Sequence, residues 1–238
     1  MADRPILATM TGEFYQPVRL HYKVLDESGL RQAFQRLQCI DYDRTQNRWV
    51  WLYAHEAKGI RFKKSYSDLP DHTHPIVLGS LFLRAENQLL LDLRSVERAI
   101  EAVPFYDRHI PRSVALLTEA EVVNKLFSAE DTSLAPASHF DNTPGQFHNP
   151  EDPVKRARRL TAGIKNPLKR RKVVMHDMNM RSKRPLPEIE RLPVHYYEDG
   201  IHGFVLALKT RQIVAFQHWL GKTDLTLLDA IRLITKTS

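Results

Sequence analysis

The sequence predicts an α+β fold, built on an antiparallel or mixed sheet with helices mainly on one face. Two patterns carry this prediction. Runs with apolar residues at every second position, typical of half-buried strands, come in pairs separated by short turns. Between these pairs lie segments whose apolar residues recur every three to four positions, as on one face of a helix. Strands joined by hairpins, with helices between the groups, favour an antiparallel or mixed sheet.

The first elements follow in order along the chain. A strand is expected at 16–24, where Val18, Leu20 and Tyr22 alternate with polar residues, and a helix at 30–37, capped by Asp26 or Ser28. Two hairpins come next, which pair 39–42 with 48–54 and 76–83 with 88–93.

Two more helices are predicted after the hairpins. The first begins near Val96 and ends at Pro104, because proline closes a helical pattern. Thr118 and Glu121 have the spacing of a capping box, which predicts a second helix running to Leu126. Residues 14–127 are therefore expected to form one α+β domain.

Residues 128–192 differ in composition and are expected to form a linker and a basic arm. The part at 128–152 is rich in Ser, Pro, Asn, Asp and Gly and has no periodicity. The arm is expected to be a largely irregular insertion, since Pro167, Pro185, Pro187 and Pro193 prevent one long helix. A short helical piece is expected around 154–160.

Residues 193–238 are expected to form a β-β-α unit. Its strands are placed at 204–208 and 213–220, and its helix begins near Thr226, which stands three residues before Asp229 in a second capping box. A unit this short has too little hydrophobic core to be stable alone. We therefore expect it to dock on the 14–127 domain and add strands to the sheet of that domain.

Charge is concentrated in the arm. Residues 155–184 hold twelve basic residues and one acid, Asp177, a charge of +11. The whole chain carries +7, so the rest of the chain carries −4. The twelve basic residues are the candidate binding residues: Lys155, Arg156, Arg158, Arg159, Lys165, Lys169, Arg170, Arg171, Lys172, Arg181, Lys183 and Arg184.

This tract points to a polyanion as its partner, because each lysine or arginine that meets a phosphate releases a counterion. We therefore expect a non-catalytic nucleic-acid-binding protein or ribonucleoprotein-assembly accessory protein. RNA is preferred to DNA, since no helix-turn-helix, zinc finger or basic zipper is recognisable. The tract lacks aromatic residues and so lacks the stacking platforms of single-strand readers. The simpler interpretation is a solvated linker.

A second interpretation is a protein-interaction or scaffold subunit whose α+β body docks a partner, with the basic segment as a tether. An exposed apolar patch that includes Trp49 or Trp51 would support it. Trp49, Trp51 and Tyr53 share one face of the predicted strand, and Val50 and Leu52 share the other. Apolar residues on both faces indicate a covered strand, so we expect the three aromatic residues in the core rather than on a base-stacking surface.

A third interpretation is a metal-dependent hydrolase or nuclease. His72 and His74 have a His-x-His spacing, and His195 and His202 flank a polar stretch. Pro75 directly follows His74, which favours a surface loop there, and no catalytic signature is present. We therefore expect no cofactor and no metal, and treat both histidine pairs as open candidates.

Cysteine count and hydropathy set the remaining limits. The single cysteine, Cys39, excludes an internal disulfide and a metal site built on several thiolates, and a small buried hydrophobe is its expected role. No apolar run approaches the ~20 residues that span a bilayer, and residues 1–12 lack the apolar core of a signal peptide. The expected location is the cytoplasm. Lys155-Arg156 with 169–172 resembles a two-part nuclear import signal, which makes the nucleus the alternative in a host that has one.

Overall fold

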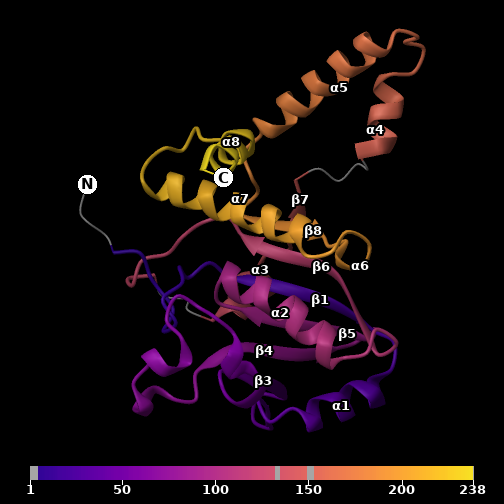
Figure 1. Ribbon diagram of the computed structural model, residues 1–238. Helices are drawn as coiled ribbons and strands as arrows, with labels where there is room; N and C mark the ends of the chain where they lie inside the picture. Colours follow the sequence, from indigo (N-terminus) through magenta and orange to yellow (C-terminus); the bar gives the residue numbers. More distant parts are fainter. Residues whose placement is uncertain (1–4, 132–134, 149–152, 238) are drawn as a thin grey trace.

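The computed structural model describes residues 5–131, 135–148 and 153–237. In this part of the chain eight α-helices accompany one eight-stranded mixed sheet, which confirms the α+β fold class (Figure 1). Two stretches of the predicted linker, 132–134 and 149–152, lie outside the described residues.

The sheet runs in the order β2-β3-β4-β5-β1-β6-β8-β7. All neighbouring strands are antiparallel except β7 and β8, which are parallel. The strands are β1 (Val18–Val24), β2 (Ile40–Asp43), β3 (Arg48–Leu52), β4 (Val77–Arg84), β5 (Gln88–Leu93), β6 (Ala115–Val123), β7 (Gln146–Phe147) and β8 (Ile189–Pro193).

The helices are α1 (Glu27–Arg36), α2 (Val96–His109), α3 (Pro136–Asn142), α4 (Pro153–Leu160), α5 (Pro167–Ser182), α6 (Tyr196–Asp199), α7 (His202–Trp219) and α8 (Leu227–Thr237). Three short 3₁₀ turns, His55–Gly59, Tyr66–Asp68 and Asp71–Thr73, connect β3 to β4.

The main core lies between α1, α2 and α7 and one face of the sheet (Figure 1). Val18 and Leu20 of β1 point to this face and are fully buried. Trp51 of β3 is also fully buried, with its ring 5.0 Å from that of Phe105 in α2. Since side chains alternate along a strand, Arg19 and His21 of β1 point to the opposite face, which α3 covers in part.

Several local predictions are confirmed. Asp26 caps α1 by accepting a hydrogen bond from the Gly29 N–H at 3.0 Å. Trp49, Trp51 and Tyr53 are buried in the core, and so is Cys39. The α8 helix begins after Thr226, whose hydroxyl donates to Asp229.

Two predictions in the first part of the chain are wrong. The helix that was to end at Pro104 continues to His109, because Phe105 and Tyr106 beyond the proline pack against Trp51. The helix predicted from Thr118 is strand β6. Its Ala120 and Val122 pair with β1 and are buried, and this long-range pairing outweighs the local capping pattern.

The arm and the segment before it are also more regular than predicted. The segment predicted as linker contains α3 and β7, because Phe140 of α3 enters a small second core with Tyr15, Phe127 and Ile189. Two helices, α4 and α5, occupy most of the predicted irregular insertion. As predicted, no single long helix forms: α4 covers the short helical piece expected around 154–160, and α5 ends at Ser182, before Pro185. Pro153 and Pro167 stand in the first turn of their helices, where the missing N–H has no helical partner.

The C-terminal β-β-α prediction is wrong in its strands. Residues 204–208 and 213–220 belong to the single helix α7, apart from Leu220, which ends it. The prediction failed because a dense apolar run does not distinguish a buried strand from a buried helix. In the structure Phe204, Leu208 and Ala215 are buried together on one face of α7. One strand from this end of the chain, β8, joins the sheet beside β6.

Candidate nucleic-acid interface

The basic arm is a hairpin of two helices that projects from the rest of the molecule (Figure 1). Gly163, with φ of +80°, lies in the connection between α4 and α5, a conformation that side chains other than glycine rarely adopt. Asn166 then caps α5 by accepting hydrogen bonds from the N–H groups of Leu168 and Lys169 at 2.9 and 3.2 Å. The turn and the cap fix where the second helix starts.

Asp177 of α5 holds the two helices together. Its carboxylate accepts two hydrogen bonds from the guanidinium of Arg156 in α4, at 2.9 and 2.7 Å. It also forms an ion pair with Arg181, one turn further along α5, at 3.0 Å. The hydrogen bonds from Arg156 are the main reason that the pKa of Asp177 lies below its ordinary value. The single acid of the tract is therefore engaged within the hairpin.

Ten of the twelve predicted binding residues are exposed. The two that are not are Arg156 and Arg181, the partners of Asp177. Arg170 also has an internal role, because its Nε donates to the backbone carbonyl of Ile164 in the hairpin turn. The exposed residues are Lys155, Arg158, Arg159, Lys165, Lys169, Arg170, Arg171, Lys172, Lys183 and Arg184. The structure thus brings the predicted residues onto one projecting element.

Two functional residues of the hairpin escaped the sequence analysis. Asp177 stood out only as an isolated acid, although its four-residue spacing to Arg181 is that of an ion pair on one helix face. Asn166 precedes a proline, a combination that signals a helix start.

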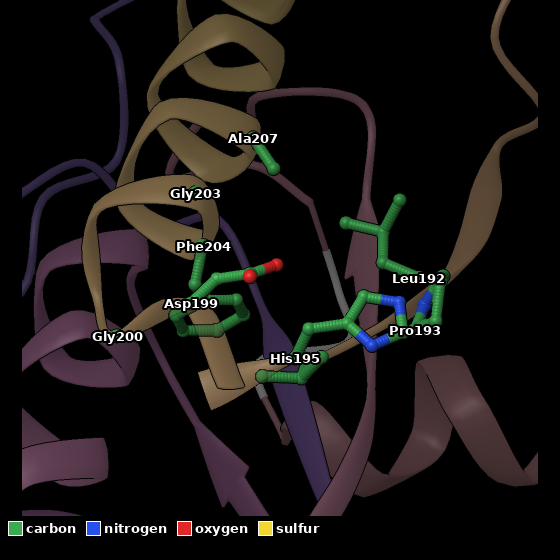
Figure 2. A pocket seen from close by; sticks show the side chains of 9 residues that line it. Leu192, Pro193, His195, Asp199, Gly200, Gly203, Phe204 and Ala207 are labelled. Carbon is green, nitrogen blue, oxygen red and sulfur yellow. The ribbon is translucent and has the colours of Figure 1, made fainter. Parts of the chain in front are cut away.

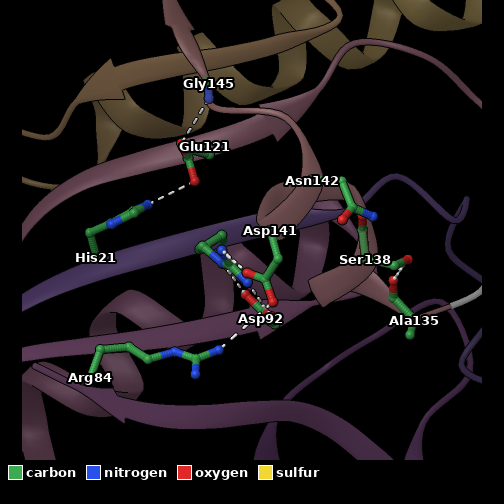
Figure 3. A network of polar contacts seen from close by, with 10 residues as sticks. His21, Arg84, Asp92, Glu121, Ala135, Ser138, Asp141, Asn142 and Gly145 are labelled. Carbon is green, nitrogen blue, oxygen red and sulfur yellow. Dashed lines mark hydrogen bonds and ion pairs between the residues drawn. The ribbon is translucent and has the colours of Figure 1, made fainter.

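A separate polar network occupies the face of the sheet under α3 (Figure 3). The Arg19 guanidinium donates two hydrogen bonds to Asp92, at 2.6 and 2.9 Å, and lies 2.8 Å from Asp141 of α3. Burial by itself would lower the pKa of Arg19, but the two carboxylates outweigh it and raise that pKa. Arg84 of β4 lies 3.7 Å from Asp141, so two arginines balance the two carboxylates, and the ion pairs attach α3 to the sheet.

Glu121 of β6 continues this network. It lies 3.0 Å from the His21 ring and accepts a hydrogen bond from the Gly145 N–H at 3.2 Å (Figure 3). Burial would raise the pKa of Glu121, but the hydrogen bond to His21 and nearby positive charges outweigh it and lower that pKa. The segment around Gly145 is thereby fastened to β6.

The histidine candidates do not converge on one site. The His74 ring packs against Tyr66 at 4.2 Å, and His72 is exposed on a 3₁₀ turn. His195 and Asp199 border a cavity of about 190 Å³ at the start of α7 (Figure 2). His202 lines a different groove, between α7 and α8.

No group of three or more His, Cys, Asp or Glu side chains in the described residues is arranged to hold a metal ion. Within the same residues, no helix has the length and apolar character needed to cross a bilayer.

Comparison of the chain with protein-family models, with curated proteins and with solved structures finds no match.

Proposed function

We propose that this protein is a non-catalytic nucleic-acid-binding protein, or an accessory subunit of a ribonucleoprotein assembly, whose α4–α5 hairpin contacts phosphates. The observation that carries the proposal is the hairpin itself. Eight exposed lysine and arginine side chains lie on it, Lys183 and Arg184 follow directly after α5, and its one acid is engaged by Arg156 and Arg181.

The helical form of the hairpin supports the proposal that its charged side chains contact phosphates. Like charges at this density repel one another and favour a disordered tail. A disordered tail loses conformational entropy when it is ordered on binding, which weakens its affinity. Here Asp177 and the cap at Asn166 hold α4 and α5 in place, so the side chains are already displayed. Seven of the twelve basic residues are arginine, whose planar fork suits phosphate oxygens.

The two alternative functions receive less support. Trp49 and Trp51 are buried, so neither belongs to an exposed apolar patch that would support the scaffold interpretation. The hydrolase interpretation requires polar groups that converge in a pocket, and His195 and His202 line separate hollows.

A salt titration with a charge-matched control tests the proposal. The arm variant replaces Arg158, Lys169, Arg171 and Lys172 with glutamine, since these side chains are exposed. The control replaces Arg36, Arg44, Arg61 and Arg108 of the body, which are equally exposed, and so changes the net charge by the same amount. Affinity is measured against single- and double-stranded RNA and DNA at several salt concentrations.

The arm variant should bind more weakly to every sequence. Each phosphate contact contributes about 0.7 to 0.9 to the slope of log K against log salt, so losing four should reduce that slope by about 3. The control should retain the slope of the native protein. Equal slopes for the native protein and the arm variant, or no binding of any of the four ligands near physiological salt, would refute the proposal.

A further inference from the structure

The outer face of α5 combines basic and apolar side chains. Leu168, Met175 and Met178 are 70, 56 and 51% exposed. With Arg171 they follow the spacing i, i+3, i+7, i+10, so the four share one stripe of the helix. Lys169, Lys172 and His176 form the adjacent stripe and are exposed as well. Asp177 lies on the other side, toward α4.

A site that binds only a polyanion needs basic side chains, but it does not need the exposed apolar side chains that α5 also carries. Phosphate contacts require only the charges, whereas exposed apolar side chains gathered on one projecting helix indicate a partner with apolar surface. The partner must therefore present negative charge beside a strip that accepts leucine and methionine. The groove of a nucleic-acid double helix has this arrangement, with phosphates at its edges and base edges, including thymine methyl groups, at its floor.

We propose that α5 lies in the major groove of a B-form DNA duplex, an inference that rests on the proposed function and takes DNA in place of the RNA that the sequence favoured. Its basic side chains meet the phosphates, and Leu168, Met175 and Met178 meet the groove floor. The major groove of B-form DNA is about 12 Å wide and admits an α-helix, whereas side chains cannot read the deep, narrow major groove of A-form RNA. The 16 residues of α5 span about 24 Å, enough to follow the groove. The hairpin projects from the rest of the molecule (Figure 1).

Two other ligands fit the face less well. Single-stranded nucleic acid is bound by stacking on aromatic rings, and residues 155–184 contain no Phe, Tyr or Trp. Helices that lie on anionic membranes usually carry Trp, Phe or Leu on a broad apolar face. The apolar stripe of α5 is interrupted by Arg171 and has only one leucine.

The test separates apolar contacts from charge. The variant Leu168→Gln/Met175→Gln/Met178→Gln keeps every charge of the arm and uses a residue of good helix propensity. The control Met10→Gln/Leu25→Gln/Leu220→Gln changes three side chains of similar exposure elsewhere, at 52, 51 and 52%. Helix content is compared by circular dichroism. The ligands are a 20-base-pair DNA duplex, the same sequence as duplex RNA, its single strands, inorganic polyphosphate and anionic phosphatidylglycerol vesicles.

We expect the native protein to bind duplex DNA at least tenfold more tightly than duplex RNA. The arm triple variant should lose about tenfold in affinity for duplex DNA at every salt concentration, with an unchanged salt slope. The affinity of this variant for polyphosphate should equal that of the native protein. The control variant should match the native protein in its affinity for every ligand and in its salt slope. Bulky substituents on C5 of the pyrimidines, which fill the major groove, should weaken binding by tenfold or more.

The outcomes separate this inference from the proposed function. If no nucleic acid binds, both fail. If the arm binds duplex DNA, duplex RNA and polyphosphate alike, and the triple variant behaves as the native protein, the proposed function stands and the groove inference is overturned. Tighter binding to duplex RNA, single strands or vesicles than to duplex DNA also overturns it.

Discussion

Single charged side chains have two different roles in this protein, and burial distinguishes them. Arg98 is 1% exposed and donates to the backbone carbonyls of Val77 and Leu78 at 2.9 and 3.2 Å. Burial lowers its pKa to about 10, so it still carries its charge at neutral pH. Most arginines of the arm, by contrast, are exposed to solvent.

The buried pair of Arg19 and Asp92 should be sensitive to the loss of one partner. Arg19→Met leaves a buried carboxylate without its partner, which costs about 3–5 kcal/mol of unfolding free energy. The double variant Arg19→Met/Asp92→Leu removes both charges and should recover most of that loss. Urea denaturation measures each value. Arg31→Ala, in the exposed pair with Glu27, is the control and should change stability by less than about 1 kcal/mol. A double variant no more stable than Arg19→Met would contradict this account.

Glu121 gives the protein a predictable response to acid. Its pKa in the folded state is lowered from the ordinary 4.5, so the unfolded state binds the proton more readily. The stabilisation is therefore complete above about pH 4.5 and is lost as the pH falls through the folded-state pKa. Thermal unfolding from pH 7 to pH 3 should show Glu121→Gln less stable than the native protein at pH 6. The difference should shrink toward pH 3, and a constant difference would argue against this role.

Among the helices, α4 and α5 are joined to each other by an ion-pair network, and α5 also contacts α8. Neither Leu168 nor any other α5 residue is buried, so no apolar core holds the hairpin. Helices of this length are marginal in water without tertiary support, and the contacts of Asp177 to Arg156 and Arg181, with that of α5 to α8, contribute to it.

Asp177→Asn should therefore loosen the hairpin. The neutral amide no longer attracts two arginines, and their repulsion within a strongly basic segment is left unbalanced. Hydrogen exchange of the α4 and α5 amides should become faster, while exchange in β1 and β5 stays slow. Asp224→Asn, at an exposed site outside the arm, is the matched control and should leave the arm unchanged. Unaltered exchange in the Asp177 variant would mean that other contacts hold the hairpin.

For the molecule as a whole, the arm and the body should be thermodynamically separate. The body has a continuous core, to which α7 contributes Phe204 and Leu208, and α7 is fastened by Arg211 to the buried Glu190 of β8 at 2.7 Å. The arm adds no buried residue to this core.

Replacing 153–184 with a short Gly-Ser linker should therefore shift the melting temperature by no more than a few degrees. For a chain of this size, about 1 kcal/mol corresponds to 2–4 °C. Differential scanning calorimetry measures the shift. Glu190→Ala, which leaves Arg211 without its partner, is the comparison and should lower the melting temperature by much more. A drop of more than about 10 °C on arm replacement would show that the arm is part of the fold.

Elements whose pattern lies within one short stretch of the chain were predictable from the sequence. The strands at β1 to β5 follow from alternation and turns, and α1 follows from its apolar face and Asp26. The candidate residues of the arm followed from charge alone. The helix predicted at Thr118 was wrong because its pattern fits both a capped helix and a strand, and only β1 selects the strand.

The sequence by itself determined the fold class, the helix starts at Asp26 and Thr226, and the separation of an acidic body from a basic arm. These depend on periodicity, on side chains that bond to their own backbone, and on charge count. Only the tertiary structure decided that 202–219 is one helix, that 135–148 packs on the sheet, and that the arm is a hairpin closed by Asp177. Each of these depends on a contact between residues far apart in the chain, such as Arg211 with Glu190 or Asp141 with Arg19, and no local pattern specifies such a contact.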